Sequence, residues 1–370
     1  PRVVHGSGRE GARLGLMTGG SGVGGRIGYV PLSPDLSVPG DRRRFPAYAE
    51  ARGIEFDVAM DWEGLDLVVL SSEADIARWV GVPKGTGLIL DLPDAFLDER
   101  RTPKSLTRGL AKWVAGPLSR PVLDHRRAVL RLIQRADAVV CSTPEQADRL
   151  GRFTDNAHVV LDLHGEVAPL APRPATGDSG LEVVWEGQHP TLVAIEQVLP
   201  ALRRLGTESE VTLSLVTDLR SPRFMNRFAV REVAEVVAGW GIEVRAHEWS
   251  ASNLRSVAMT ADLAIVPVEL TDPYTVGKPE NRMRIFWRLG LPVVASDTPS
   301  HRRAMKLAGL SGHVLCRTTD DWTEALGRYA GDPGLRSVDS ELGHVAALGP
   351  YGDPTVLAGW DAVFTSLGAL

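Results

Sequence analysis

Three polar side chains suited to phosphate binding open one predicted helix in the C-terminal half of the chain. Lys278, Asn281 and Arg282 stand at the start of a helix predicted over residues 279–289, which carries an apolar face and stops at Gly290. A helix N-terminus favours anions because its first backbone N–H groups have no partner within the helix, and a lysine at its entry adds a full positive charge. These residues therefore predict a phosphate-binding site.

The segments around this helix follow the order of an open parallel sheet. A loop leads into the helix, and an apolar strand is predicted after it, at residues 292–296. In such sheets ligands bind in the crevice at the carboxyl ends of the strands. Residues that follow three other predicted strands are expected in the same crevice: Gly187 and Gln188 after strand 181–186, Asp218 after strand 210–217, and Trp249 after strand 242–248.

The run of residues 277–302, GKPENRMRIFWRLGLPVVASDTPSHR, resembles the C-terminal signature of GT-B glycosyltransferases, especially their retaining, family-four-like group. This resemblance implies an α/β fold in which two doubly wound, Rossmann-like domains face a central cleft. It implies that Lys278 contacts the diphosphate of a nucleotide-sugar donor, with Arg282 as the second candidate. It also implies that Gly187 and Gln188 lie beside the diphosphate and that Trp249 lies beside the nucleotide base.

Two positions depart from the family pattern. Where the family usually has a glutamate that holds the donor ribose, this chain has Ile285, so either Glu280 or Asn281 takes that task or nucleotide binding is altered. Where the family often has an arginine after the first-strand glycine, this chain has Gln188, for which Arg220 or Arg282 could substitute.

The N-terminal half offers candidates for the acceptor side of the cleft. A short strand is predicted at residues 13–17, and a glycine-rich run follows it; by the resemblance, Gly20 in this run borders the donor sugar. Asp91 and Asp94 follow a strand predicted at 87–92, where they would face a substrate hydroxyl, although Asp94 could equally cap a helix. Their spacing is not the Asp-x-Asp that holds a divalent ion in metal-dependent glycosyltransferases, so no metal is expected.

Residues 100–135 predict two basic amphipathic helices. Such helices can lie on anionic lipid or bind an anionic lipid-linked acceptor, and the alternative is an ordinary solvated basic face over a core contact. His125 lies on the second helix, where it is a candidate for the acceptor side or a satisfied surface or core histidine.

Composition and patterning predict two domains in a chain of 370 residues. We expect an acceptor-side domain at 1–166, a proline-containing linker at 167–180, a nucleotide-sugar domain at 181–350, and a helix at 351–370 that crosses back to the first domain. Within the second domain a helix is predicted at 226–239. The net charge of −5 argues against nucleic acid as a partner.

The predicted location is the cytoplasm, with possible peripheral contact at the inner face of the membrane through residues 100–135. Cys141 and Cys316 lie in apolar runs and are expected to be buried free thiols in a reducing compartment. The sequence predicts neither a membrane-spanning helix nor a signal peptide.

The predicted function is transfer of a sugar from a nucleotide-diphosphate sugar, with UDP- or GDP-sugars foremost, to a hydroxyl of a saccharide, glycolipid or natural product. The reaction is expected to retain anomeric configuration and to need no cofactor or metal. Lys278, Arg282 and Asp94 are the catalytic candidates. Two alternatives stay open: a sugar-nucleotide epimerase, which uses the same fold, and a degenerate GT-B subunit that binds or scaffolds a partner, for which Ile285 and Gln188 are the motivation.

Overall fold

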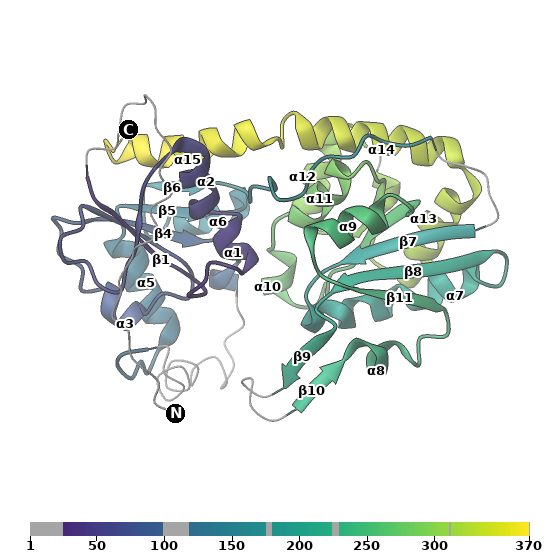
Figure 1. Cartoon of the computed structure of the whole chain (residues 1–370), viewed down its shortest axis with the longest axis horizontal. Helices are drawn as coiled ribbons and strands as arrows, with labels where there is room; N and C mark the ends of the chain where they lie inside the picture. Colours follow the sequence, from purple (N-terminus) through teal and green to yellow (C-terminus); the bar gives the residue numbers. More distant parts are fainter. Residues whose placement is uncertain (1–24, 99–117, 175–179, 224–228, 311, 370) are drawn as a thin grey trace, which may run out of the picture.

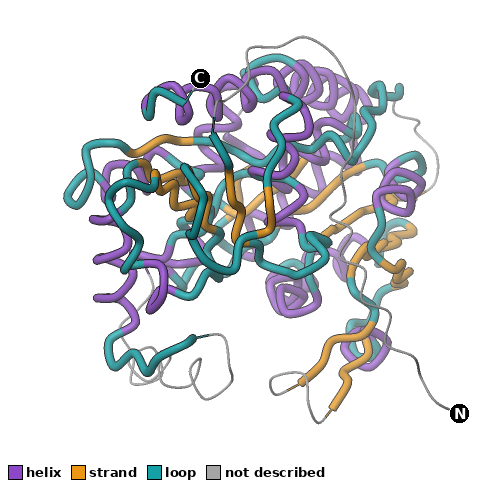
Figure 2. The backbone as a smooth tube through the Cα atoms, turned by 60° about the vertical axis from the view of Figure 1, so that its left-hand side comes forward, coloured by secondary structure: helices purple, strands orange, loops and turns teal. Residues whose placement is uncertain are grey.

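The computed structural model describes residues 25–98, 118–174, 180–223, 229–310 and 312–369, and it contains two parallel sheets of six strands each (Figure 1). Helices surround the strands of each sheet (Figure 2). The predicted fold class, two doubly wound α/β domains, is confirmed. The strand predicted at residues 13–17 and the glycine-rich run with Gly20 lie outside the described residues.

The sheet of the N-terminal domain has the strand order β2-β1-β3-β4-β5-β6. Strands β3 and β5 are fully buried apolar runs, and β4 between them is buried except at Gly87, as parallel strands covered on both faces require. The strands are β1 (Ile27–Val30), β2 (Asp57–Val58), β3 (Leu67–Leu70), β4 (Gly87–Leu92), β5 (Ala138–Cys141) and β6 (Ala157–Val159). The helices are α1 (Pro39–Arg42), α2 (Phe45–Arg52), α3 (Ile76–Trp79), η1 (Phe96–Asp98), α5 (His125–Arg135) and α6 (Pro144–Leu150).

The sheet of the C-terminal domain has the strand order β11-β8-β7-β12-β13-β14. Its strands are β7 (Gly180–Glu186), β8 (Glu210–Thr217), β11 (Glu243–Glu248), β12 (Leu263–Val266), β13 (Val293–Ser296) and β14 (Leu315–Cys316). The helices are η2 (His189–Gln197), α7 (Leu199–Leu205), α8 (Val233–Val237), α9 (Ala251–Ala258), α10 (Pro273–Val276), α11 (Asn281–Arg288), α12 (Pro299–Ala308), η3 (Gly312–Val314), α13 (Thr319–Gly331) and α14 (Pro333–Leu348).

The prediction of one helix over residues 226–239 is wrong for its first described part. Residues Ala229–Glu232 form strand β10, which pairs antiparallel with β9 (Arg220–Arg223), and only α8 is helical. This hairpin extends from the end of β8 (Figure 1). Pairing with β9 gives the backbone of β10 a ladder of hydrogen bonds that the helical spacing of valines in residues 226–239 does not reveal.

The two domains are joined twice at one end of the molecule. The chain first crosses between β6 and β7, and it returns through α15 (Asp353–Ser366), which continues the line of α14 along the top of Figure 1. Trp360 and Phe364 of α15 are buried against Phe45 and Tyr48 of α2. The last helix therefore belongs to the core of the N-terminal domain.

Gly290 lets the first crossing pass close to the end of α11. It has a positive φ of 67°, and a Cβ atom there would lie 2.8 Å from the carbonyl oxygen of Leu170 and the nitrogen of Pro172. Leu170 in turn donates its backbone N–H to the carbonyl of Arg288. Both the conformation and the space demand glycine at this point.

Candidate functional site

Lys278 lies in the loop between α10 and α11, where it meets the other domain. Its Nζ is 3.7 Å from Oδ1 of Asp94, which follows β4 of the N-terminal domain. Tyr274 of α10 donates its hydroxyl to Oδ2 of Asp94 at 2.9 Å, and the Lys278 ammonium lies 5.1 Å from the Tyr274 ring centroid. The structure thus brings two predicted catalytic residues, Lys278 and Asp94, together between the domains.

The close approach of this loop depends on Gly277. A Cβ atom at Gly277 would lie 2.6 Å from Cβ of Ala95 and 3.0 Å from a carboxylate oxygen of Asp98. Both neighbours belong to the N-terminal domain, so a larger residue would push the domains apart. The pair of Lys278 and Asp94 therefore exists because the preceding residue has no side chain.

Arg282 points from the first turn of α11 toward the end of β7. Its Nη2 donates to the Thr191 hydroxyl at 3.2 Å, and its guanidinium carbon lies 5.7 Å from the Trp185 ring centroid. Burial lowers the pKa of Arg282, and the nearby charge of Glu186 opposes that shift. Among the described residues no carboxylate lies within ion-pair distance of Arg282. This cation therefore remains available to an anionic ligand.

The turn after β7 is tight at Gly187. A Cβ atom there would lie 2.7 Å from the Trp185 ring and 2.9 Å from the Thr191 hydroxyl, so only glycine fits. Gln188 is exposed, and its carbonyl accepts hydrogen bonds from the backbone and hydroxyl of Thr191. The backbone of this turn consequently lies beside the Thr191 hydroxyl, which accepts the hydrogen bond from Arg282.

Trp249 links the domains at the end of β11. Its indole Nε1 donates to Oε1 of Glu186 at 2.8 Å. The guanidinium carbon of Arg42, from α1 of the N-terminal domain, lies 4.2 Å from the Trp249 ring centroid, and that of Arg43 lies at 5.7 Å. The ring that the resemblance assigns to the nucleotide base thus has an arginine against it.

Glu186 is a functional candidate that the sequence reasoning missed. It is the last residue of β7 and only 7% exposed. The available signal was a carboxylate at the carboxyl end of a buried strand, the same signal that singled out Asp91.

Asp218 follows β8 and is exposed. Partial desolvation raises the pKa of its carboxyl group, and the charge of Glu248 adds to that shift. Its carbonyl oxygen lies 3.3 Å from Nδ1 of His189, the residue that opens η2. Asp218 therefore lies at the same edge of the sheet as Gly187 and Trp249.

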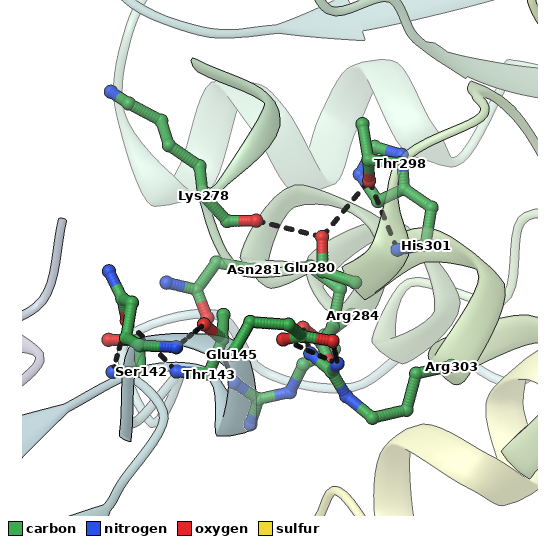
Figure 3. Close-up of polar contacts among 12 residues, drawn as sticks. Ser142, Thr143, Glu145, Lys278, Glu280, Asn281, Arg284, Thr298, His301 and Arg303 are labelled. Carbon is green, nitrogen blue, oxygen red and sulfur yellow. Dashed lines mark hydrogen bonds and ion pairs between the residues drawn. The ribbon is translucent and has the colours of Figure 1, made fainter. Parts of the chain in front are cut away.

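Glu280 faces away from Lys278. The carboxylate is 1% exposed, and it accepts from the Tyr351 hydroxyl at 2.7 Å and from Nη2 of Arg303 at 3.3 Å. Arg303 also makes a two-pronged contact with Glu145 of the N-terminal domain, at 2.7 and 2.9 Å. Figure 3 shows the Lys278 side chain pointing away from this group.

A cavity of about 480 Å³ opens on the Glu280 side of the α11 N-terminus. It has walls from both domains: Pro144, Val159, Leu161, Glu280, Leu307 and Tyr351. Asn281 accepts a hydrogen bond from Arg284 at 3.1 Å, and Ile285 is buried in the core. Both predicted ribose-binding residues, Glu280 and Asn281, are therefore engaged by other side chains of the protein.

Asp91 is occupied inside the N-terminal domain. It is 4% exposed, and its two carboxylate oxygens accept from Nη2 and Nε of Arg44 at 2.5 and 2.9 Å. Arg44 also pairs with Asp162, at 3.2 Å. This buried network separates Asp91 from the exposed pair of Asp94 and Lys278.

His125 is the first residue of α5 and is partly buried. Of the two basic helices predicted in residues 100–135, the first lies outside the described residues and the second is α5. Arg126 and Arg135 of α5 donate to backbone carbonyls of the N-terminal domain, which favours a structural use of these charges. No helix in the described part of the chain is both long and apolar enough to cross a bilayer.

No protein-family model and no curated protein sequence matches the chain. Solved structures do match: HepE from Anabaena, crystallised with UDP, superposes with a TM-score of 0.61 at 12% identity, over 92% of this chain and 100% of HepE. The chain has a GT-B fold. Sucrose-phosphate synthase from Thermosynechococcus elongatus superposes on this GT-B chain with a TM-score of 0.53 at 14% identity, covering 88% of this chain and 76% of its own.

TarM from S. aureus, in a mutant complex with fondaparinux, α-GlcNAc-glycerol and UDP, has a TM-score of 0.52 at 10% identity. That match covers 80% of this chain, which spans only 55% of the TarM chain. At these identities the structures establish the GT-B fold predicted from residues 277–302. Activity has to be argued from the residues of this chain.

Proposed function

We propose that this GT-B chain is a glycosyltransferase that moves a sugar from a nucleotide-diphosphate sugar to a hydroxyl acceptor. The observation that carries the proposal is the pair of cations at the N-terminus of α11. Lys278 and Arg282 flank that helix start, and neither is buried in an ion pair: Lys278 forms a partly exposed pair with Asp94, and Arg282 donates to the Thr191 hydroxyl. Helix N-terminus and cations together favour a diphosphate.

The chemistry fits this arrangement. As the bond from the anomeric carbon to the diphosphate breaks, its electron pair passes to the diphosphate oxygen, and Lys278 and Arg282 stabilise the charge that develops there. The acceptor oxygen forms the new bond, and its proton passes to the departing diphosphate. We propose that the acceptor attacks from the face that the diphosphate leaves, which retains the anomeric configuration. Fixed cations suffice for this step without a metal ion.

Asp94 is the acceptor-side residue that we retain. It comes from the other domain, contacts Lys278 at 3.7 Å, and its side chain is 35% exposed, so it can accept a hydrogen bond from an incoming hydroxyl. The acceptor is a saccharide or lipid-linked saccharide in this proposal. HepE and TarM were both crystallised with UDP, which makes UDP the first nucleotide to test.

Calorimetric titration of the purified chain with UDP, GDP, ADP and dTDP tests the proposal. One nucleotide should bind, and Lys278→Ala should weaken it at least tenfold. Lys84→Ala, which removes an exposed lysine of the N-terminal domain, is the matched control and should leave affinity unchanged. Absence of binding by all four nucleotides would overturn the proposal and favour a degenerate scaffold subunit.

A further inference from the structure

The carboxylate of Glu186 is only half used by the protein. Oε1 accepts the Trp249 indole N–H at 2.8 Å, whereas none of the described residues donates a hydrogen bond to Oε2. A buried carboxylate normally has partners for both oxygens. Glu186 therefore has acceptor capacity left over at the carboxyl end of β7.

Two arginines of the other domain, Arg42 and Arg43, interact electrostatically with this carboxylate. Burial alone would lower the pKa of Arg43, but the charges of Glu186 and Glu166 raise it, which places Arg43 within electrostatic reach of Glu186. Nη2 of Arg43 is a buried donor without a hydrogen-bond partner. No ion pair within 4.0 Å joins Arg43 to Glu186 among the described residues. A ligand group that both donates and accepts, such as a hydroxyl, would satisfy both sides.

The position of Glu186 along the crevice matches one part of a nucleotide. On one side lies Trp249, the residue assigned to the base, and on the other lie Gly187 and Arg282, assigned to the diphosphate. In a nucleoside diphosphate the ribose stands between base and diphosphate. The group between the two assigned ends should therefore recognise ribose.

We propose that Glu186 binds the ribose hydroxyls of the donor nucleotide and that Trp249 positions its carboxylate for this task. The inference rests on the proposed function and deepens it. It moves ribose recognition from Glu280 and Asn281, which the structure engages elsewhere, to a residue on a different strand end. It also explains how a chain with Ile285 in its core can recognise a ribonucleotide.

The test compares UDP with 2′-deoxy-UDP by calorimetry on each protein. The wild type should bind UDP at least tenfold more tightly than the deoxynucleotide, because a buried polar group left without its hydroxyl is costly. Glu186→Ala should reduce that preference to less than threefold. Trp249→Phe keeps the ring but loses the indole N–H, so it should reduce the preference partially.

Glu182→Ala is the matched control, since Glu182 lies on the same strand but pairs with Arg245 outside this cluster. It should keep the wild-type preference. The preference is a ratio measured within one protein sample, so loss of folded material does not change it; if Glu186→Ala does not fold, the near-isosteric Glu186→Gln takes its place and should lower the ratio.

Two outcomes separate the inference from the function on which it rests. If UDP binds and both Glu186 variants keep the wild-type ratio, the ribose assignment is overturned and the glycosyltransferase proposal stands. If the wild type binds none of UDP, GDP, ADP and dTDP, the proposed function itself fails. If only GDP or ADP binds, the same comparison uses that nucleotide and its 2′-deoxy form. Binding of dTDP alone, which lacks the 2′ hydroxyl, would overturn the ribose assignment.

Discussion

The ammonium of Lys278 and the carboxylate of Asp94 lie 3.7 Å apart across the boundary between the two domains. Their side chains are 39% and 35% exposed, so the pair contributes little stability in water. A diphosphate carries more charge than Asp94 and can replace it as the partner of Lys278. The contact thus keeps the Lys278 ammonium between the domains and still allows it to bind a diphosphate.

Removing the Asp94 charge should tighten nucleotide binding. Asp94→Asn eliminates the competitor for Lys278, and because exposed pairs of this kind contribute up to about 1 kcal/mol, we expect a gain of roughly two- to fivefold in UDP affinity. Calorimetry at low and high salt measures it, and the gain should shrink as salt screens the charges. Asp57→Asn, in an exposed pair with Arg26, is the control. Unchanged affinity in Asp94→Asn would contradict the competition.

Loss of the Lys278 charge should slow the chemical step. If Lys278 stabilises the departing diphosphate as one oxyanion-hole donor does, Lys278→Ala should cost about 2 to 4 kcal/mol of transition-state stabilisation. Release of UDP from a panel of UDP-sugars, with water or a saccharide as acceptor, measures turnover at saturating donor. Turnover equal to that of the wild type would remove Lys278 from the mechanism.

Gly290→Ala should destabilise the C-terminal domain more than Gly309→Ala. Both glycines have a positive φ, 67° and 71°, so both variants bear the conformational cost of about 1 kcal/mol that alanine incurs there. Only at Gly290 does the added Cβ meet the crossing backbone, at 2.8 Å; at Gly309 it meets nothing within 4 Å. Urea unfolding of the two variants gives the comparison. Equal losses of unfolding free energy would show that the crossing backbone moves away from the added Cβ without an energetic penalty.

Acid should weaken the fold through His164. This side chain is buried in the crossing segment, and burial, together with the charges of Arg284, Arg43 and Arg288, holds its pKa well below 6.5. The unfolded chain therefore binds a proton that the folded chain excludes. The stability from neutral His164 is complete above pH 6.5 and falls as the pH drops below it, by up to about 1.4 kcal/mol per pH unit.

The variant His164→Gln isolates this contribution. Buried His301 and partly buried His158 also have lowered pKa values, so the wild type should lose stability between pH 7.5 and 5.5 by more than one histidine explains. In His164→Gln the loss should be smaller by about 1 kcal/mol. His247→Gln, on β11, is the control. A pH dependence identical to that of the wild type would show that His164 protonates without cost.

Local patterns predicted most of the architecture. Strands such as β3 and β5 are apolar runs of the right length, and α6 begins with a Thr143–Gln146 capping box and a proline, all readable within a few residues. The hairpin of β9 and β10 was not predicted, because the pairing of the two strands with each other, rather than the local sequence, determines their conformation. Helix α14 was not predicted, although Asp332 caps it and Pro333 opens it.

For the candidate site, too, local features could be predicted from the sequence, whereas contacts between distant residues could not. The placement of Lys278 and Arg282 at a helix start follows from the adjacent sequence. The direction of Glu280 does not, because Tyr351 and Arg303, which lie far along the chain, determine where its carboxylate points. The bond between Trp249 and Glu186 joins residues 63 positions apart and comes from the strand order of the sheet.

The packing of Trp360 and Phe364 against Phe45 and Tyr48 also sets the order of events during synthesis. When the residues of the N-terminal domain leave the ribosome, one wall of that domain's core has not yet been synthesised. That wall consists of side chains from residues 356–364. Domains usually fold as they emerge, N-terminal first. Here the N-terminal domain has to wait until the C-terminal one has been made, and its apolar face is exposed to chaperones in the meantime.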